Sequence, residues 1–157
     1  MRRWPRSSRP RTPPPAHPQP PTPRPALSNA PPGFVPLLLE LSAQEADEGR
    51  RAELLQRARR ACDAVWQRGL LTKGVGLCHG IGGNAYAFLA LARTTGEAAA
   101  LARAQRFALH AARNWRQLFD VPDRPASLYE GLSGAVCVLM DALLAPSGGG
   151  MPGYDDL

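Results

Sequence analysis

A glycine turn occurs three times in this chain, each time directly before an apolar stretch, and this repeat constrains the fold more than any other feature. The turns end at Gly33, Gly83 and Gly134, so they are spaced 50 and 51 residues apart. A segment with the apolar spacing of an amphipathic helix fills each interval. The pattern predicts stacked helical hairpins, each with a buried inner helix after its glycine turn and a half-buried outer helix behind it. Because stacked hairpins run in the same direction, we expect the glycine turns at one end, where they would build one site.

The apolar and amphipathic stretches together predict an all-α chain of about two and a half hairpins, which looks like the end of a larger array. The stretch 84–91 is apolar on every side, which is typical of a helix that is buried all round. His110, on an outer helix, is expected to be exposed or at the rim. The predicted inner helices are residues 34–41, 84–91 and 135–144, and the predicted outer helices are residues 50–68 and 97–118.

The first 33 residues differ in composition from the rest of the chain. They hold twelve of the 17 prolines and six arginines but no acidic residue, so they carry all of the net charge of +6. Such a segment buries too little apolar surface to offset the entropy of ordering, so we expect a disordered or polyproline-like leader over residues 1–33. A solvated leader without a specific role is the simplest interpretation, and contact with an SH3-type protein or an anionic membrane surface is the alternative. A helical segment at 34–146 and a flexible C-terminus at 147–157 complete the predicted organisation.

The charge and the apolar pattern argue against several classes of protein. The chain after residue 33 is neutral, so the isoelectric point near 10.0 describes the leader and does not indicate a nucleic-acid-binding domain. No apolar signal segment follows the arginines, and no stretch approaches the ~20 apolar residues of a membrane span. Three cysteines without an export signal indicate a reducing compartment with free or metal-bound thiols. We therefore expect a cytoplasmic protein.

The second glycine turn carries the residues with the most chemistry. Cys78 and His79 are adjacent and directly precede the helix that Asn84 opens. The positive end of a helix favours a thiolate, and Cys and His are the usual zinc ligands. A catalytic zinc ion has three protein ligands and one open position, so this pair supplies two candidates and lacks a third. The alternative for such a pair is a structural Cys beside a hydrogen-bonded His, and Cys62 and Cys137 are expected to be core residues on apolar helix faces.

Three motifs in fixed order make the chain recognisable. They are Val-Trp-Gln-Arg-Gly-Leu-Leu at 65–71, Lys-Gly-Val-Gly-Leu-Cys-His-Gly at 73–80 with Gly-Asn-Ala-Tyr-Ala-Phe at 83–88, and Pro-Asp-Arg-Pro-Ala-Ser-Leu-Tyr-Glu-Gly-Leu-Ser-Gly at 122–134. On these residues the segment from 34 to about 144 resembles the C-terminal part of the eukaryotic LanC-like proteins, relatives of the bacterial lanthionine synthetase cyclases.

The resemblance implies an α/α toroid of repeated hairpins with a zinc ion at the top of its inner barrel. It also implies that the zinc activates a thiolate, from glutathione or a peptide Cys, for addition to a dehydroamino acid in a peptide. Carried over residue by residue, the resemblance implies that Cys78 and His79 are zinc ligands and that Lys73 helps to bind the thiol substrate. Glu130 lies near the same site as an acid, base or orienting group, or else interacts with the start of the following helix.

One departure from the family pattern concerns the metal. Ser28 stands where the family has its remaining Cys ligand, five residues before Gly33. A zinc ion held by two protein ligands is bound more weakly than one held by three. The sequence therefore predicts a truncated family member with impaired activity. The alternatives are a non-catalytic helical interaction module, which could be peripheral at the plasma membrane, and an incomplete chain that does not fold alone.

Overall fold

The computed structural model describes residues 30–69, 74–119, 123–144 and 150–153 of the 157-residue chain. All regular elements in these ranges are helices, which confirms the predicted all-α fold. None of the described helices is both long and apolar enough to cross a membrane. The helices are α1 (Ala30–Gln44), α2 (Glu48–Arg68), α3 (Ile81–Thr95), α4 (Ala98–Arg113), α5 (Trp115–Phe119) and α6 (Leu132–Leu143).

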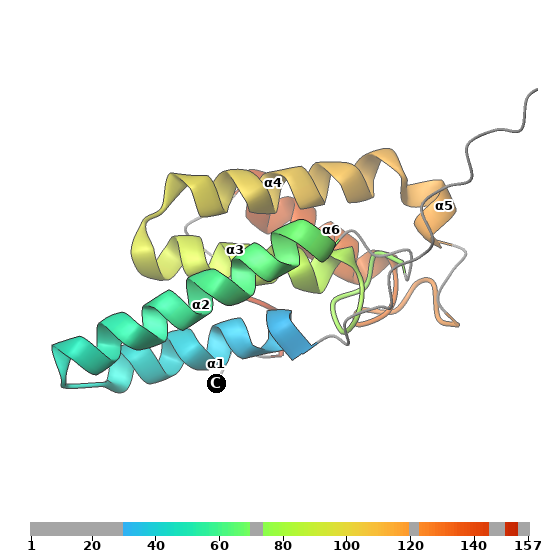
Figure 1. Cartoon of the computed structure of the whole chain (residues 1–157). Helices are drawn as coiled ribbons and strands as arrows, with labels where there is room; N and C mark the ends of the chain where they lie inside the picture. Colours follow the sequence, from blue (N-terminus) through green and yellow to red (C-terminus); the bar gives the residue numbers. More distant parts are fainter. Residues whose placement is uncertain (1–29, 70–73, 120–122, 145–149, 154–157) are drawn as a thin grey trace, which may run out of the picture.

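The helices form two antiparallel hairpins and the inner helix of a third. α1 pairs with α2, α3 pairs with α4, and α6 packs against both α3 and α4 (Figure 1). The inner helices α1, α3 and α6 lie side by side with α3 in the middle, as the expected stacking requires. The chain therefore has the predicted two and a half hairpins in its described part.

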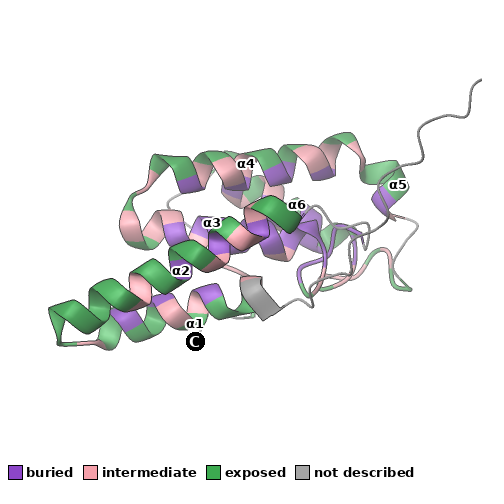
Figure 2. Cartoon of the chain, viewed as in Figure 1, coloured by how far each residue is buried: buried purple, intermediate pink, exposed green. Residues whose placement is uncertain are grey.

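The core lies around α3, which Figure 2 shows as largely buried. Nine of its fifteen residues are buried, and its Phe88 is fully buried. The Phe88 ring stacks on Phe107 of α4 with 5.5 Å between centroids, and Trp66 of α2 meets the Phe107 ring edge-on at 6.0 Å. Cys62 of α2 is also buried in this core, as predicted, whereas Cys137 of α6 and His110 of α4 are half-buried. The outer helices are thus fixed to α3 by aromatic packing.

Several helix ends differ from the sequence prediction. α3 and α6 each begin three residues earlier than expected, because their glycine turns form the first helical turn. α1 begins at residue 30, where prolines are tolerated since the N–H groups of a first turn have no partner in the helix. The predicted helix at 97–118 is interrupted at Asn114, whose side chain donates a hydrogen bond to the His110 carbonyl at 2.9 Å.

The two predicted terminal segments fall largely outside the described residues. Of the leader predicted at 1–33, only residues 30–33 are described, and they belong to α1. Of the predicted C-terminus at 147–157, residues 150–153 are described, and Met151 packs against the core. Ser28 and Lys73 also lie outside the described residues.

Candidate functional site

The loop that leads into α3 holds the Cys-His pair and folds back onto the start of that helix. The Ile81 N–H donates to the Gly74 carbonyl at 3.1 Å, and the Gly83 N–H donates to the Gly76 carbonyl at 3.3 Å. Gly74 has a φ of 104°, which glycine adopts without strain. Asn84 is buried and donates to the Gly69 carbonyl at 2.6 Å, so it ties α3 to the end of α2. These bonds fix the loop on both sides of Cys78.

The loop that leads into α6 repeats this geometry 51 residues later. Its Leu132 N–H donates to the Pro125 carbonyl at 2.7 Å, in the same way that Ile81 bonds to Gly74. Gly80 and Gly131 precede the two helices with similar extended backbone angles, φ −108° and −120°. The two loops are therefore equivalent members of the repeat. At equivalent positions, Cys78 corresponds to Tyr129 and His79 to Glu130.

The two loops are in direct contact. The Cys78 N–H donates to the Tyr129 carbonyl at 3.0 Å. A Cβ atom placed on Gly76 would come within 2.6 Å of the Glu130 Cα, so only glycine fits there without moving the second loop. The Glu130 N–H in turn donates to the Ser127 Oγ at 3.2 Å. The glycine loops thus meet at one end of the molecule, as the repeat predicts, and they bring Glu130 to the neighbourhood of Cys78.

Cys78 is exposed and lies beside the His79 ring, with 2.7 Å between Sγ and Nδ1. The expectation that the helix start yields a thiolate is wrong for the groups that the structure describes, because burial outweighs the backbone hydrogen bonds at Cys78 and His79 that favour the thiolate. Partial burial, and after it the negative charge of Glu130, raise the pKa of the Cys78 thiol above its usual value. The thiol is therefore protonated at neutral pH unless a cation binds next to it.

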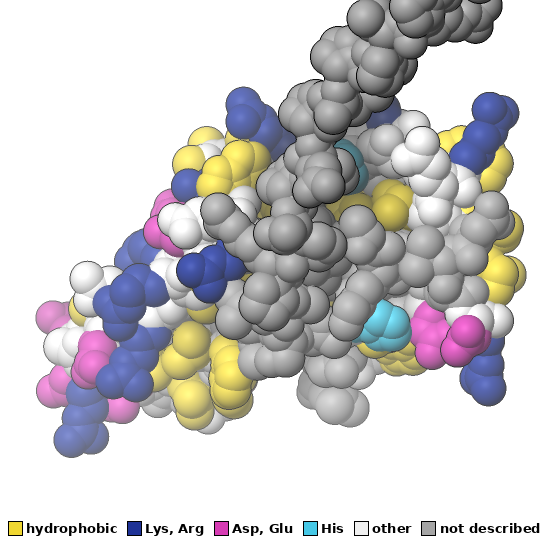
Figure 3. Space-filling view, turned by 45° about the vertical axis from the view of Figure 1, so that its right-hand side comes forward, with side chains coloured by type: hydrophobic (Ala, Val, Ile, Leu, Met, Phe, Trp, Pro, Cys, Tyr) yellow, Lys and Arg dark blue, Asp and Glu magenta, His cyan; other side chains and the backbone are white. Residues whose placement is uncertain are grey.

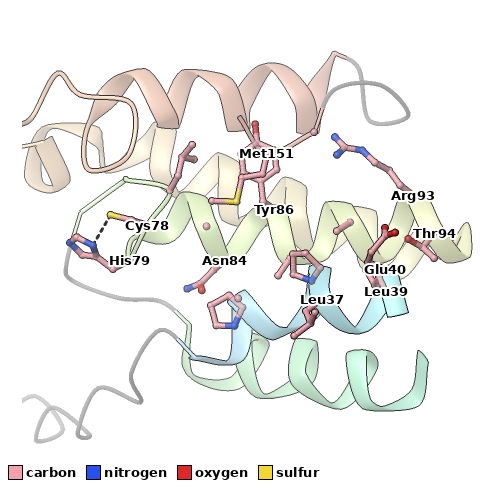
Figure 4. A pocket seen from close by; sticks show the side chains of 18 of the residues that line it. Leu37, Leu39, Glu40, Cys78, His79, Asn84, Tyr86, Arg93, Thr94 and Met151 are labelled. Carbon is pink, nitrogen blue, oxygen red and sulfur yellow. Dashed lines mark hydrogen bonds between the residues drawn. The ribbon is translucent and has the colours of Figure 1, made fainter. Parts of the chain in front are cut away.

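A groove of about 1070 Å³ opens beside the pair and runs between α1 and α3 (Figure 4). Cys78 and His79 lie at one end of it, together with Pro32 and Gly33 at the start of α1. The first and second glycine segments therefore lie at the same end of the groove, and the third loop contacts the second through the Cys78–Tyr129 hydrogen bond. The face in Figure 3 shows basic and acidic side chains interspersed at one side, without a broad patch of one sign.

A profile of the family described as lanthionine synthetase C-like protein matches residues 31–147. The chain belongs to this family. It is 43% identical over 103 residues to "Glutathione S-transferase LANCL1" of Danio rerio, a match that covers 66% of this chain and 25% of that protein. It is also 40% identical over 99 residues to "LanC-like protein GCL1" of Arabidopsis thaliana, covering 60% of this chain and 22% of that protein. This LanC-like chain spans about a quarter of the length of these curated relatives.

The donor atoms of the LanC-like chain fit zinc in type but not in number. A thiol sulfur and an imidazole nitrogen are preferred zinc ligands, and in Cys78 and His79 they are close enough to share one ion. Among the described residues, however, no three His, Cys, Asp or Glu side chains are grouped so that they could hold a metal. The described part of this LanC-like chain therefore offers two donors of the kind that zinc prefers, whereas a catalytic zinc site has three protein ligands.

Sequence reasoning missed two features of the LanC-like site. The first is Gly76, which allows the contact between the two loops, and its close approach to Glu130 depends on tertiary structure. The second is the groove, which is bordered on α3 by small residues such as Ala87 and Ala90. Their spacing is visible in the sequence, but an alanine stripe is equally typical of tight helix packing.

Proposed function

We propose that this chain contributes to a centre that adds a thiol to a dehydroamino acid in a peptide, with Cys78 and His79 as zinc ligands. The observation that carries the proposal is the pairing of Cys78 Sγ and His79 Nδ1 at the end of a groove large enough for a substrate. The name of the Danio rerio relative supports glutathione as the thiol.

The chemistry requires a thiolate as nucleophile. Zinc, when bound, would supply this by deprotonating a coordinated thiol at neutral pH. In the addition, the sulfur forms a bond to the β-carbon of the dehydroamino acid, the α,β double bond becomes a single bond, and the α-carbon takes up a proton. Glu130 is the carboxylate whose charge acts on Cys78, so it is suited to hold or deliver that proton. Lys73 is proposed to orient the anionic thiol substrate and lies outside the described residues.

The first experiment measures zinc in the purified full chain by elemental analysis. We expect the Cys78→Ala variant to lose bound zinc, while Cys137→Ala, which changes a half-buried thiol on α6, keeps it. Equal zinc content in the wild-type chain and in Cys78→Ala would contradict the assignment. Ser28→Cys should raise zinc affinity by adding the third donor, and glutathione addition to a dehydroalanine peptide should increase with it.

A second candidate function is a non-catalytic helical interaction module. The observation that favours it is a stripe of exposed apolar side chains on α6, formed by Leu132, Val136, Met140 and Leu143. An apolar stripe of this kind is typical of a surface that another helix covers. Under this function the chain folds without zinc and adds no thiol, so the zinc measurement distinguishes the two candidates.

A further inference from the structure

The groove continues well beyond the Cys-His pair. It follows α1 from Gly33 to Ala43 and α3 from Gly83 to Thr94, with the two helices running in the same direction (Figure 4). Ten residues of helix at about 1.5 Å per residue give the groove a length of about 15 Å. An extended peptide at about 3.3 Å per residue covers this distance with four to five residues. The groove is thus longer than a site for the thiol alone would need to be.

The middle of the groove is apolar. Leu37 of α1 borders it and keeps half of its surface, 51%, exposed. Small residues line the opposite wall on α3, where Ala87 and Ala90 leave room for the side chains of a ligand. Met151 of the C-terminal segment lies over the same region (Figure 4). An apolar ligand side chain placed here would cover surface that is now in contact with water.

The far end of the groove is polar and holds Glu40, Arg93 and Thr94. The Glu40 carboxylate is exposed and accepts a hydrogen bond from the neutral Gln44 side chain at 2.7 Å, a contact that does not balance its charge. Burial, and after it the Asp141 carboxylate, raise the pKa of the Tyr86 hydroxyl, and the Arg93 charge lies close enough to this pair to oppose the rise. Glu40 is therefore the group at this end that suits a basic ligand residue.

We propose that the groove binds the peptide that carries the dehydroamino acid, in an extended conformation and over four to five residues. The modified residue lies at Cys78 and His79, apolar side chains follow between Leu37 and Ala90, and a basic residue reaches Glu40. The inference rests on the proposed function for the identity of the residue at the reactive end. The length of the groove, its apolar middle and the exposed Glu40 carboxylate at its polar far end are features of the groove itself.

The test is a binding measurement that needs no reaction. Fluorescein-labelled Ala-Leu-Leu-Gly-Lys and its reversed sequence carry an unreactive Ala in place of the dehydroamino acid, and their affinities for the full chain are measured by anisotropy. We expect at least one of the two orders to bind about tenfold more tightly than its counterpart with Asp-Asp in place of Leu-Leu. The proposal would be overturned if, in both sequence orders, the Leu-Leu peptide and its Asp-Asp counterpart bound with equal affinity.

Two pairs of variants test the groove itself. Glu40→Lys should weaken binding of the Lys peptide by about threefold and leave a peptide with a neutral last residue unaffected. The matched control is Glu53→Lys, the same charge change on the exposed outer face of α2, and an equal effect of both variants would contradict a role for Glu40. Ala90→Phe should fill the groove and weaken binding about tenfold, with Leu37→Asn at the exposed wall as a second variant that does not disturb the core.

These results distinguish peptide binding in the groove from the proposed catalytic function. Peptide binding with the expected selectivity but without thiol addition would uphold the groove and refute the catalytic function. Thiol addition to a dehydroalanine amide that has no flanking residues, together with unselective peptide binding, would refute the groove and uphold the catalytic function.

Discussion

α3 and α6 begin in the same way but lie in different surroundings. Both follow an extended glycine, and the first N–H of each donates to a carbonyl seven residues earlier. Nine of fifteen residues are buried in α3, whereas four of twelve are buried in α6. The start of each helix is a local structure that glycines permit, but burial depends on neighbours. α3 has inner helices on both sides, while α6 packs against α3 and α4 and exposes its opposite face.

The loops before α3 and α6 have the same backbone course but different side chains. The two loops share their backbone course, yet Cys78 and His79 of one are replaced by Tyr129 and Glu130 in the other. Because the loops touch, residues at equivalent repeat positions converge on one site instead of forming separate copies of it. A repeat of this kind gives each hairpin one contribution to a shared centre.

The largest expected difference between the two helices is the loss of stability when a large apolar side chain is replaced by Ala. Phe88→Ala in α3 should lower the free energy of unfolding by about 3–5 kcal/mol, because the ring is fully buried between two other aromatic rings. Met140→Ala in α6 should change it by about 0.5 kcal/mol or less, since that side chain is 51% exposed. Urea unfolding of both variants tests this, and similar costs would show that α6 is covered in solution.

Unfolding at alkaline pH should test the burial of the Cys62 thiol, which lies on α2 where that helix faces α3. Burial, followed by the charge of Asp63, raises the pKa of the Cys62 thiol from 9.0 to about 12. Between these values the unfolded chain loses the proton and the folded chain keeps it, so the stability present below pH 9 falls by about 1.4 kcal/mol per pH unit. Urea unfolding between pH 8 and 11 should show this loss in the wild-type chain and in Cys137→Ala. An equally steep loss in Cys62→Ala would mean that other groups cause it.

A smaller difference is expected from the polar side chains at the two helix starts. Asn84→Ala removes a buried hydrogen bond to the Gly69 carbonyl and should cost about 1–3 kcal/mol. Ser133→Ala removes the exposed bond from Ser133 Oγ to the Ala126 carbonyl at 2.7 Å and should cost about 0.5 kcal/mol or less, because water replaces the donor. Thermal unfolding of the two variants provides the comparison. A larger loss of stability for Ser133→Ala than for Asn84→Ala would show that the side-chain hydrogen bond of the α6 loop is the more important of the two.

The smallest effect concerns the direct link between the helices. The Tyr86 hydroxyl of α3 donates to the Asp141 carboxylate of α6 at 2.5 Å. Tyr86→Phe should therefore lower stability by about 1 kcal/mol and increase amide hydrogen exchange in α6 more than in α3. An unchanged exchange rate in α6 would indicate that packing alone holds it in place.

The sequence predicts the repeat well and the details of its ends less well. The spacing of the glycine turns and the apolar periodicity were sufficient for the hairpins, their order and the meeting of the turns at one end. The interruption at Asn114 could not be predicted, because the amphipathic pattern continues through it and an Asn side chain can compete for helix carbonyls at many positions.

At the site, motif and structure contribute different information. The motif identified Cys78, His79 and Glu130, and the structure places the three residues at the contact between the two loops. The raised pKa of Cys78 was not predictable, because it depends on partial burial and on a carboxylate 52 residues away in the chain. The roles of Ser28 and Lys73 stay predictions, since both lie outside the described residues.

The contact of Gly76 with the second loop has a mechanical consequence. The Cys78 amide is bonded to Tyr129, and the space beside Gly76 is filled by the backbone of Glu130, so neither loop can shift without displacing the other. A ligand that pushes on the α6 loop therefore moves the Cys78 main chain as well. The two hairpins are in contact at this point, so a substitution that displaces Tyr129 or Glu130 is expected to displace the Cys78 sulfur as well.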